Sequence, residues 1–151
     1  MATETDHKLE LLARGVGTWE GVEKMPPSDR APEGITAVGR NIARMTAGDA
    51  ILVNDYTQTI NGEVTMRGHA VTVWNDAKRR CFMYYFDSAG NPPAVFEGDF
   101  HDGALALVGD TPEGQIRHTT DHPDADTMRT VSDILVGDSW QRVFESTYKR
   151  T

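Results

Sequence analysis

The sequence lacks the features that mark several large protein classes. Its 151 residues include one cysteine, Cys81, which excludes an internal disulfide. No apolar run approaches the ~20 residues that a transmembrane helix needs. Asp and Glu number 23 against 15 Lys and Arg, giving a net charge of −8, and no basic block is present. We therefore expect neither a membrane partner nor a nucleic-acid partner, because nucleic acid selects for concentrated positive charge.

Signatures of familiar catalytic and cofactor sites are also missing. The sequence contains no Gly-x-Ser-x-Gly elbow, no recognisable Cys–His pair, and no Walker or dinucleotide glycine pattern. No His-x-His or His-x-x-x-His spacing puts two imidazoles on one face together with a third ligand, as a firm zinc site would. We interpret the cluster of His118, His122, Asp121, Asp124 and Asp126 as an acidic solvated loop. The prediction is no metal, no cofactor and no catalytic residue.

Size and terminal sequence suggest a compact cytoplasmic protein. A chain of 151 residues fits one domain, residues 1–151. The segment Met1–His7 lacks the basic head and apolar stretch of a signal peptide, so we expect a cytoplasmic location. Cys81 lies in an apolar, strand-like segment and is expected to pack as a small hydrophobic residue.

The chain changes from one helical segment to a long series of strands. Thr5 and Asp6 precede clustered leucines, which indicates a short amphipathic helix that ends before Gly15. After it, alternating segments are separated by turn residues, which indicates about ten β-strands. We predict them at Val16–Met25, Ile35–Met45, Ile51–Ile60, Val64–Trp74, Arg80–Asp87, Ala94–Phe100, Ala104–Gly109, Gln115–Thr120, Met128–Val136 and Trp140–Lys149.

Tight turns between these segments favour an antiparallel meander. Asn61-Gly62 supplies the positive φ angles of a two-residue hairpin, and similar turn residues recur along the chain. Longer loops are expected at 25–34 and 120–125. A meander of ten strands closes most easily into an up-and-down β-barrel, which removes exposed edges. A β-sandwich is the alternative.

Several segments carry a family resemblance. They are Leu11 to Gly21, with Gly17, Trp19 and Gly21 at alternate positions, then Phe82 to Ser88, Phe96-Glu97-Gly98, and Phe144 to Arg150. Together they resemble the bacterial domain-of-unknown-function family 1579, within the lipocalin-like, or calycin, barrels. The resemblance implies a barrel with an internal cavity and no established reaction. The Gly-x-Trp-x-Gly motif is also similar to that of the haem-binding nitrobindin barrels. These would require a histidine on the late strands, and the last strand has none, so haem is not expected.

Strand parity suggests which side chains face the barrel interior, although one bulge would invert an assignment. Arg40 and Arg142 each have apolar neighbours on the same face and are candidates for binding an anion. Their alternative is an exposed arginine whose stem covers apolar surface. His69 is predicted to lie outside, and His118 is ambiguous. The predicted ligand-binding residues are Trp19, which also fills the barrel end, Arg40, Tyr84, Tyr85, Arg142 and Phe144.

Three functions from different classes remain open. The first is a barrel that binds a small hydrophobic or amphipathic molecule in its interior. The second is a cofactor-free enzyme of the decarboxylase or isomerase type, for which Arg40, Tyr56, Tyr85, Glu97 and Arg142 supply the residue types. The third is a barrel filled with side chains that serves as an association module, with a homodimer as the expected assembly.

Overall fold

The computed structural model describes all residues, Met1–Thr151, and begins with one helix. Helix α1 spans Glu4–Ala13. Its first turn is closed by a capping box: the Asp6 amide donates to the Thr3 hydroxyl at 3.1 Å, and the Thr3 amide donates to the Asp6 carboxylate at 2.9 Å. The cap is therefore Thr3, ahead of the predicted Thr5 and Asp6. The helix ends before Gly15, as predicted.

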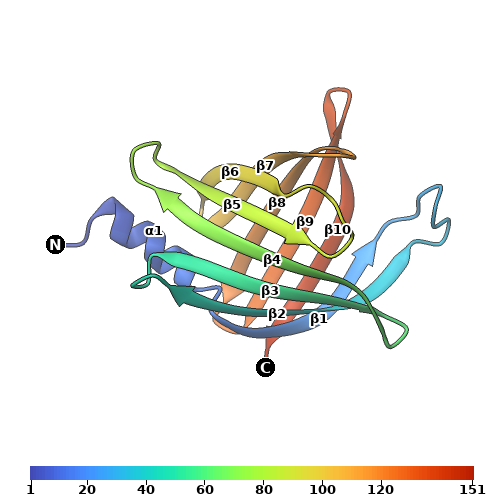
Figure 1. The fold of residues 1–151 in the computed structure, drawn as a ribbon, viewed down its shortest axis with the longest axis horizontal. Helices are drawn as coiled ribbons and strands as arrows, with labels where there is room; N and C mark the ends of the chain where they lie inside the picture. The colour runs from blue at the N-terminus through green and yellow to red at the C-terminus, as the bar shows by residue number, and fades with distance from the viewer.

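Ten antiparallel strands follow and close into one barrel, which confirms the predicted up-and-down barrel and excludes the sandwich (Figure 1). Each strand pairs with its neighbours in sequence, and β1 pairs with β10 to complete the ring. Asn61 and Gly62 have φ angles of 51° and 82°, as a two-residue hairpin requires. The strands are β1 (Gly17–Met25), β2 (Ile35–Thr46), β3 (Ile51–Ile60), β4 (Glu63–Asn75), β5 (Arg80–Asp87), β6 (Ala94–His101), β7 (Ala104–Thr111), β8 (Gly114–Asp124), β9 (Thr127–Val136) and β10 (Ser139–Arg150).

The predicted loop at 120–125 is wrong, because β8 continues through most of it. The strand runs to Asp124, and the pairing with β9 shifts between Asp121 and Asp124. Pro123 lies inside this irregularity, where a residue without an amide proton is tolerated in a strand. As a result His122 belongs to the barrel wall instead of an acidic solvated loop.

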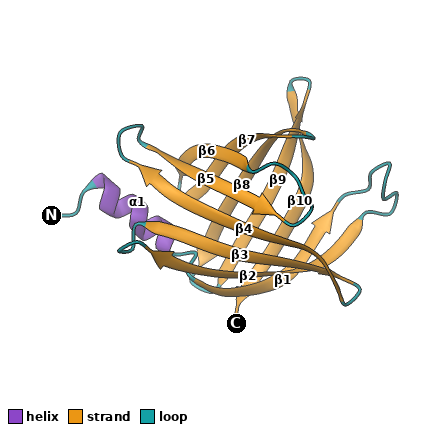
Figure 2. Ribbon diagram, in the orientation of Figure 1, coloured by secondary structure: helices purple, strands orange, loops and turns teal.

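Helix α1 covers one end of the barrel (Figure 2). Leu12 of the helix is buried against Cys81, Phe96 and Leu107, which come from β5, β6 and β7. Burial raises the pKa of the Cys81 thiol to about 12, so this cysteine is an unreactive packing residue, as predicted.

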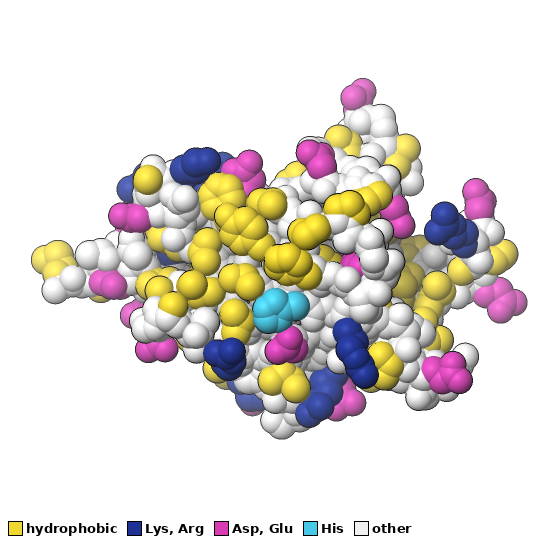
Figure 3. Space-filling model, in the orientation of Figure 1, with side chains coloured by type: hydrophobic (Ala, Val, Ile, Leu, Met, Phe, Trp, Pro, Cys, Tyr) yellow, Lys and Arg dark blue, Asp and Glu magenta, His cyan; other side chains and the backbone are white.

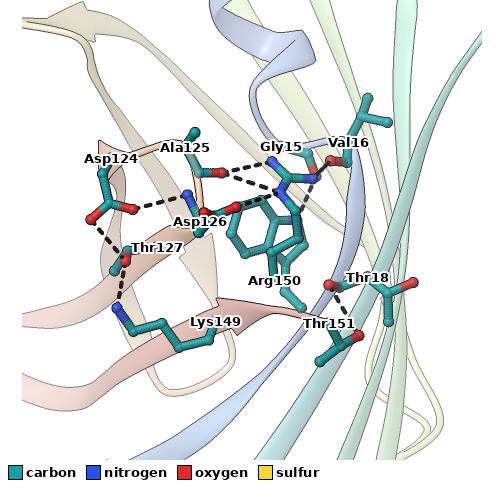
Figure 4. Close-up of polar contacts among 11 residues, drawn as sticks. Gly15, Val16, Thr18, Asp124, Ala125, Asp126, Thr127, Lys149, Arg150 and Thr151 are labelled. Carbon is teal, nitrogen blue, oxygen red and sulfur yellow. Dashed lines mark hydrogen bonds and ion pairs between the residues drawn. The ribbon is translucent and has the colours of Figure 1, made fainter.

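Arg150, at the end of β10, makes hydrogen bonds to neighbouring segments at the same end of the barrel (Figure 4). Its guanidinium donates to the carbonyl oxygens of Val16 and Ala125 and lies 4.2 Å from the centre of the Trp19 ring. Trp19 is fully buried, and its indole N–H donates to the Gly15 carbonyl at 2.9 Å. The prediction that Trp19 fills the barrel end is thereby confirmed.

The outer surface of the barrel carries exposed hydrophobic side chains. Figure 3 shows them gathered over β4 to β6 on the face in view. Tyr84 and Phe86 on β5 and Val95 on β6 are among the exposed large hydrophobic residues. His69 is also outside, as predicted, with its Nδ1 2.8 Å from Asp55. Helix α1 is too short and too polar to cross a membrane.

Candidate functional site

The barrel encloses a cavity of about 640 Å³ that begins under α1. Leu11, Leu12 and Arg14 border it at the helix end, and the exposed Glu113 borders it at the opposite end, where the cavity reaches the surface. Twenty of the 33 lining residues are hydrophobic. A volume of this size accommodates a small organic molecule. The barrel is therefore not filled with side chains. The third functional hypothesis required a filled barrel, and its premise is wrong.

Three of the six predicted ligand-binding residues line this cavity. Trp19 borders it at the helix end, Tyr85 projects from β5, and Phe144 projects from β10. Burial is the main reason that the pKa of Tyr85 rises to about 12, and the nearby carboxylates of Asp87 and Glu23 add to the effect. The Tyr85 hydroxyl therefore stays protonated at neutral pH.

Arg40 and Tyr84 lie on the outer face of the barrel instead. The inward residues of β2 are small or polar: Ala37, Gly39, Asn41 and Ala43. Arg40 lies between two of them in the sequence, so its side chain points to the opposite face and is exposed. On β5, Tyr85 is inside and its neighbour Tyr84 is 41% exposed. Strand parity grouped the residues of β2 and β5 correctly, but it did not indicate which group faces inward.

Arg142 also lies outside, and a bulge explains why. The register of β10 against β9 shifts between Arg142 and Phe144, and both Val143 and Phe144 line the cavity. Arg142 instead donates from Nε to Asp133 at 2.7 Å, and Arg117 donates to the same carboxylate at 3.2 Å. Burial raises the pKa of Asp133, but the two arginines outweigh it and hold the pKa below its usual value. Arg142 thus has its carboxylate partner on the barrel surface.

The charged group inside the barrel is Glu23 of β1, which sequence reasoning missed. Its side chain is 0% exposed and accepts hydrogen bonds from Tyr56, Gln58 and Tyr148. The Tyr56 hydroxyl lies 2.7 and 2.8 Å from the two carboxylate oxygens, and the Gln58 amide nitrogen lies 3.1 Å from Oε1. No lysine or arginine makes an ion pair with this carboxylate, so hydrogen bonds alone compensate its burial.

The two tyrosines stand between Glu23 and the cavity. Tyr56, Gln58 and Tyr148 line the cavity, whereas Glu23 lies behind them. Burial, and then the Glu23 carboxylate, raise the pKa of Tyr56 and Tyr148 far above that of a free phenol. Both hydroxyls therefore remain protonated and keep donating to Glu23.

Gly39 makes room for this cluster. A Cβ atom at Gly39 would lie 2.0 Å from Glu23 Oε2 and 2.9 Å from the Tyr148 ring, distances that no packed carbon tolerates. The signal was present in the sequence, because Glu23 shares the parity of Trp19 and Gly21 on β1. Extending that alternation by one step would have placed the glutamate inside.

Opposite parts of the cavity lining differ in chemistry. We name polar wall the lining residues of β2, β3 and β10 on one side, together with the glutamate of β1 that lies behind them: Asn41, Asn54, Tyr56, Gln58, Tyr148 and Glu23. We name apolar wall the group on β5 to β8: Met83, Phe96, Phe100, Leu105, Leu107 and Ile116. The cavity is therefore suited to an amphipathic molecule.

Two histidines also line the cavity, which resolves the ambiguity of His118. The Nδ1 atom of His118 lies 2.9 Å from the Ser132 hydroxyl, and burial lowers the pKa of this imidazole to about 4. The His122 ring lies 5.4 Å from the Trp19 ring, and burial, then the charge of Arg14, lower its pKa. Both rings are neutral at pH 7. No three His, Cys, Asp or Glu side chains come together in a group that could hold a metal ion.

Comparisons with known proteins agree with this architecture. The model of a family described as "Protein of unknown function (DUF1579)" matches residues 4–150. The structure of the S-type phycobiliprotein lyase CPES from Guillardia theta is similar over 99% of this chain and 98% of that one, with a TM-score of 0.66 and 14% identity. At that identity the likeness concerns the lipocalin-like fold alone. A search among curated proteins found no match.

Proposed function

The chain belongs to this family, Protein of unknown function (DUF1579), and we propose that it binds a small hydrophobic or amphipathic molecule inside its barrel. The cavity of about 640 Å³, predominantly apolar and reaching the surface at Glu113, is the observation that carries the proposal. The similar barrel of a phycobiliprotein lyase supports a binding role for the fold. We further place the protein in the cytoplasm, as the sequence predicts.

Trp19, Tyr85 and Phe144 are the predicted residues that we assign to ligand contact. Each borders the cavity and offers an aromatic face to an apolar part of the ligand. Arg40, Tyr84 and Arg142 are withdrawn from the binding site because they lie on the outer surface. The expected anion-binding arginine pair is therefore wrong.

Native mass spectrometry of the freshly purified protein tests the proposal first. We expect a retained small molecule, or uptake of an added apolar fluorophore whose emission rises inside the barrel. Substitution Ser132→Trp would place an indole in the cavity and abolish that uptake. Ser139→Trp is the matched control, because Ser139 is exposed on the barrel surface. Equal uptake by both variants, with both folded by circular dichroism, would contradict binding inside the barrel.

A cofactor-free enzyme is the second candidate, and the Glu23 cluster favours it. The sequence hypothesis required a carboxyl group beside a tyrosine, and Glu23 contacts both Tyr56 and Tyr148. The glutamate is not Glu97, which is exposed and pairs with Arg80 at 3.2 Å. A buried carboxyl group beside phenols that line a cavity supplies the residue types of general acid–base catalysis. Turnover of a retained molecule that Tyr56→Phe and Tyr148→Phe both abolish would establish the enzyme.

The predicted homodimer is retained as a proposal. Tyr84, Phe86 and Val95 form an exposed apolar strip on β5 and β6 that could be covered by a second copy. Analytical ultracentrifugation should give twice the chain mass, and Phe86→Ser should return the protein to monomer. A wild-type protein that sediments as a monomer at all accessible concentrations would remove this proposal.

A further inference from the structure

The charges around the cavity are the reverse of what a ligand carboxylate would need. The two arginines expected to hold an anion are outside the barrel, and the group buried in its wall is the Glu23 carboxylate. Arg14 is the one arginine or lysine that borders the cavity, and it lies at the helix end with its guanidinium donating to the Gly103 carbonyl. The cavity beside the polar wall is therefore negative in character.

The donors of Tyr56, Tyr148 and Gln58 are committed to partners within the polar wall. A phenol has one proton, and Tyr56 and Tyr148 each donate theirs to Glu23. The Gln58 amide nitrogen donates to Glu23 at 3.1 Å and to the Tyr56 oxygen at 3.2 Å, while its Oε1 accepts from the Thr65 hydroxyl. A ligand therefore meets acceptors on these three residues and no free proton.

Asn54 adds an acceptor that has no partner. Its amide nitrogen donates to Asn41 Oδ1 at 2.8 Å, which fixes the orientation of the Asn54 amide. Asn54 lines the cavity, and its Oδ1 atom is buried and receives no hydrogen bond. A buried acceptor without a donor is unfavourable, and a donating ligand would remove that penalty.

We propose that the polar wall recognises the protonated amine of an amphipathic ligand, whose apolar tail lies against the apolar wall. The ammonium group donates to Asn54 Oδ1 and to the free lone pairs of the Tyr56 and Tyr148 oxygens. Glu23 acts from behind the tyrosines and supplies the negative charge that favours a cation in a site of low polarity. This inference rests on the proposed binding function and names its ligand class.

Three probes with the same tail and different head groups test the inference. Decylammonium, decanol and decanoate are titrated separately at pH 7, below their micelle concentrations, by isothermal calorimetry. We expect decylammonium to bind at least about tenfold more tightly than decanoate, with decanol between them. Binding of decanoate as tight as that of decylammonium would overturn the inference and leave the binding function standing. Binding of no probe would instead overturn the binding function.

Glu23→Gln separates the charge of the polar wall from its shape. The amide has the size of the carboxylate, so the variant is expected to fold, as circular dichroism would show. The preference for decylammonium over decanol should disappear. Glu20→Gln is the matched control, because Glu20 lies on the same strand with an exposed side chain and should keep the preference. A preference that survives in Glu23→Gln would assign selection to another part of the cavity.

Discussion

The polar wall and the apolar wall enclose the same cavity but are built from different interactions. The apolar wall consists of side chains that bury hydrocarbon against α1 and against each other, such as Phe96, Leu107 and Leu12. The polar wall contains a carboxylate that would be unfavourable inside the barrel without its three donors, Tyr56, Gln58 and Tyr148. The apolar wall thus supplies stability, whereas we propose that the polar wall supplies specificity at some cost in stability.

Truncation of the apolar wall should give the largest loss of stability. Leu107 is 2% exposed and packs in the core cluster beneath the helix. We expect Leu107→Ala to lower the free energy of unfolding by about 3 kcal/mol, measured by urea denaturation, because it removes buried hydrocarbon. Val95→Ala, on the exposed outer face, should cost less than about 1 kcal/mol. Equal losses in the two variants would show that the interior is not the stabilising core.

Removal of the carboxylate should break the polar wall. In Glu23→Ala the donors of Tyr56, Gln58 and Tyr148 lose their acceptor, and we expect a loss of about 2–3 kcal/mol in the same assay. Glu20→Ala should change stability by less than about 0.5 kcal/mol, since its side chain is exposed. A Glu23→Ala variant more stable than wild type would mean that burial of the charge outweighs its hydrogen bonds.

Acidification should lower the stability of the protein through His118, which belongs to neither wall. The folded protein holds the pKa of His118 near 4, against 6.5 for an ordinary histidine, so the unfolded chain binds the proton more tightly. Stability is therefore complete above the ordinary pKa and falls as the pH drops toward 4. Between pH 7 and pH 5 we expect a loss of about 1–2 kcal/mol from this residue.

The variant His118→Gln isolates that contribution. It keeps a polar side chain beside Ser132 but does not titrate, so its stability should depend less steeply on pH between 7 and 5. His69→Gln, which removes a histidine from the outer face of the barrel, is the matched control. Parallel curves for wild type and His118→Gln would contradict the assigned pKa.

The smallest effect is expected from loss of one hydroxyl in the polar wall. Tyr56→Phe removes one donor to Glu23 and keeps the ring, so we expect a cost of about 1 kcal/mol by urea denaturation. Tyr84→Phe removes an exposed hydroxyl from the outer face and should change nothing measurable. A Tyr56→Phe variant as stable as wild type would show that Gln58 and Tyr148 suffice for Glu23.

Most of the fold was predictable from the sequence, because hairpin turns and alternation act locally. Asn61-Gly62 indicated the hairpin between β3 and β4, and the leucines before Gly15 indicated the helix. The strand at 120–124 was missed because Pro123 is typical of a loop and is accommodated here by a bulge. In this segment local signals failed because the strand pairing accommodated an unfavourable residue.

The binding site was less predictable, because the direction of each strand face depends on the closed barrel. Alternation grouped Arg40 apart from Asn41 and Tyr84 apart from Tyr85, but it does not reveal which group is inside. The bulge after Arg142 is invisible in the sequence and placed Phe144 inside with Arg142 outside. Glu23 was missed because a glutamate in a strand normally faces solvent, and its three donors come from β3 and β10.

A crystal structure of the protein with bound decylamine tests most directly whether the polar wall binds the amine and the apolar wall binds the tail. The account predicts that the ligand nitrogen lies about 3 Å from Asn54 Oδ1 and the Tyr56 oxygen. The decyl chain should extend along Phe96 and Leu107. A nitrogen directed to solvent at Glu113, with the decyl chain against Tyr56 and Tyr148, would contradict it.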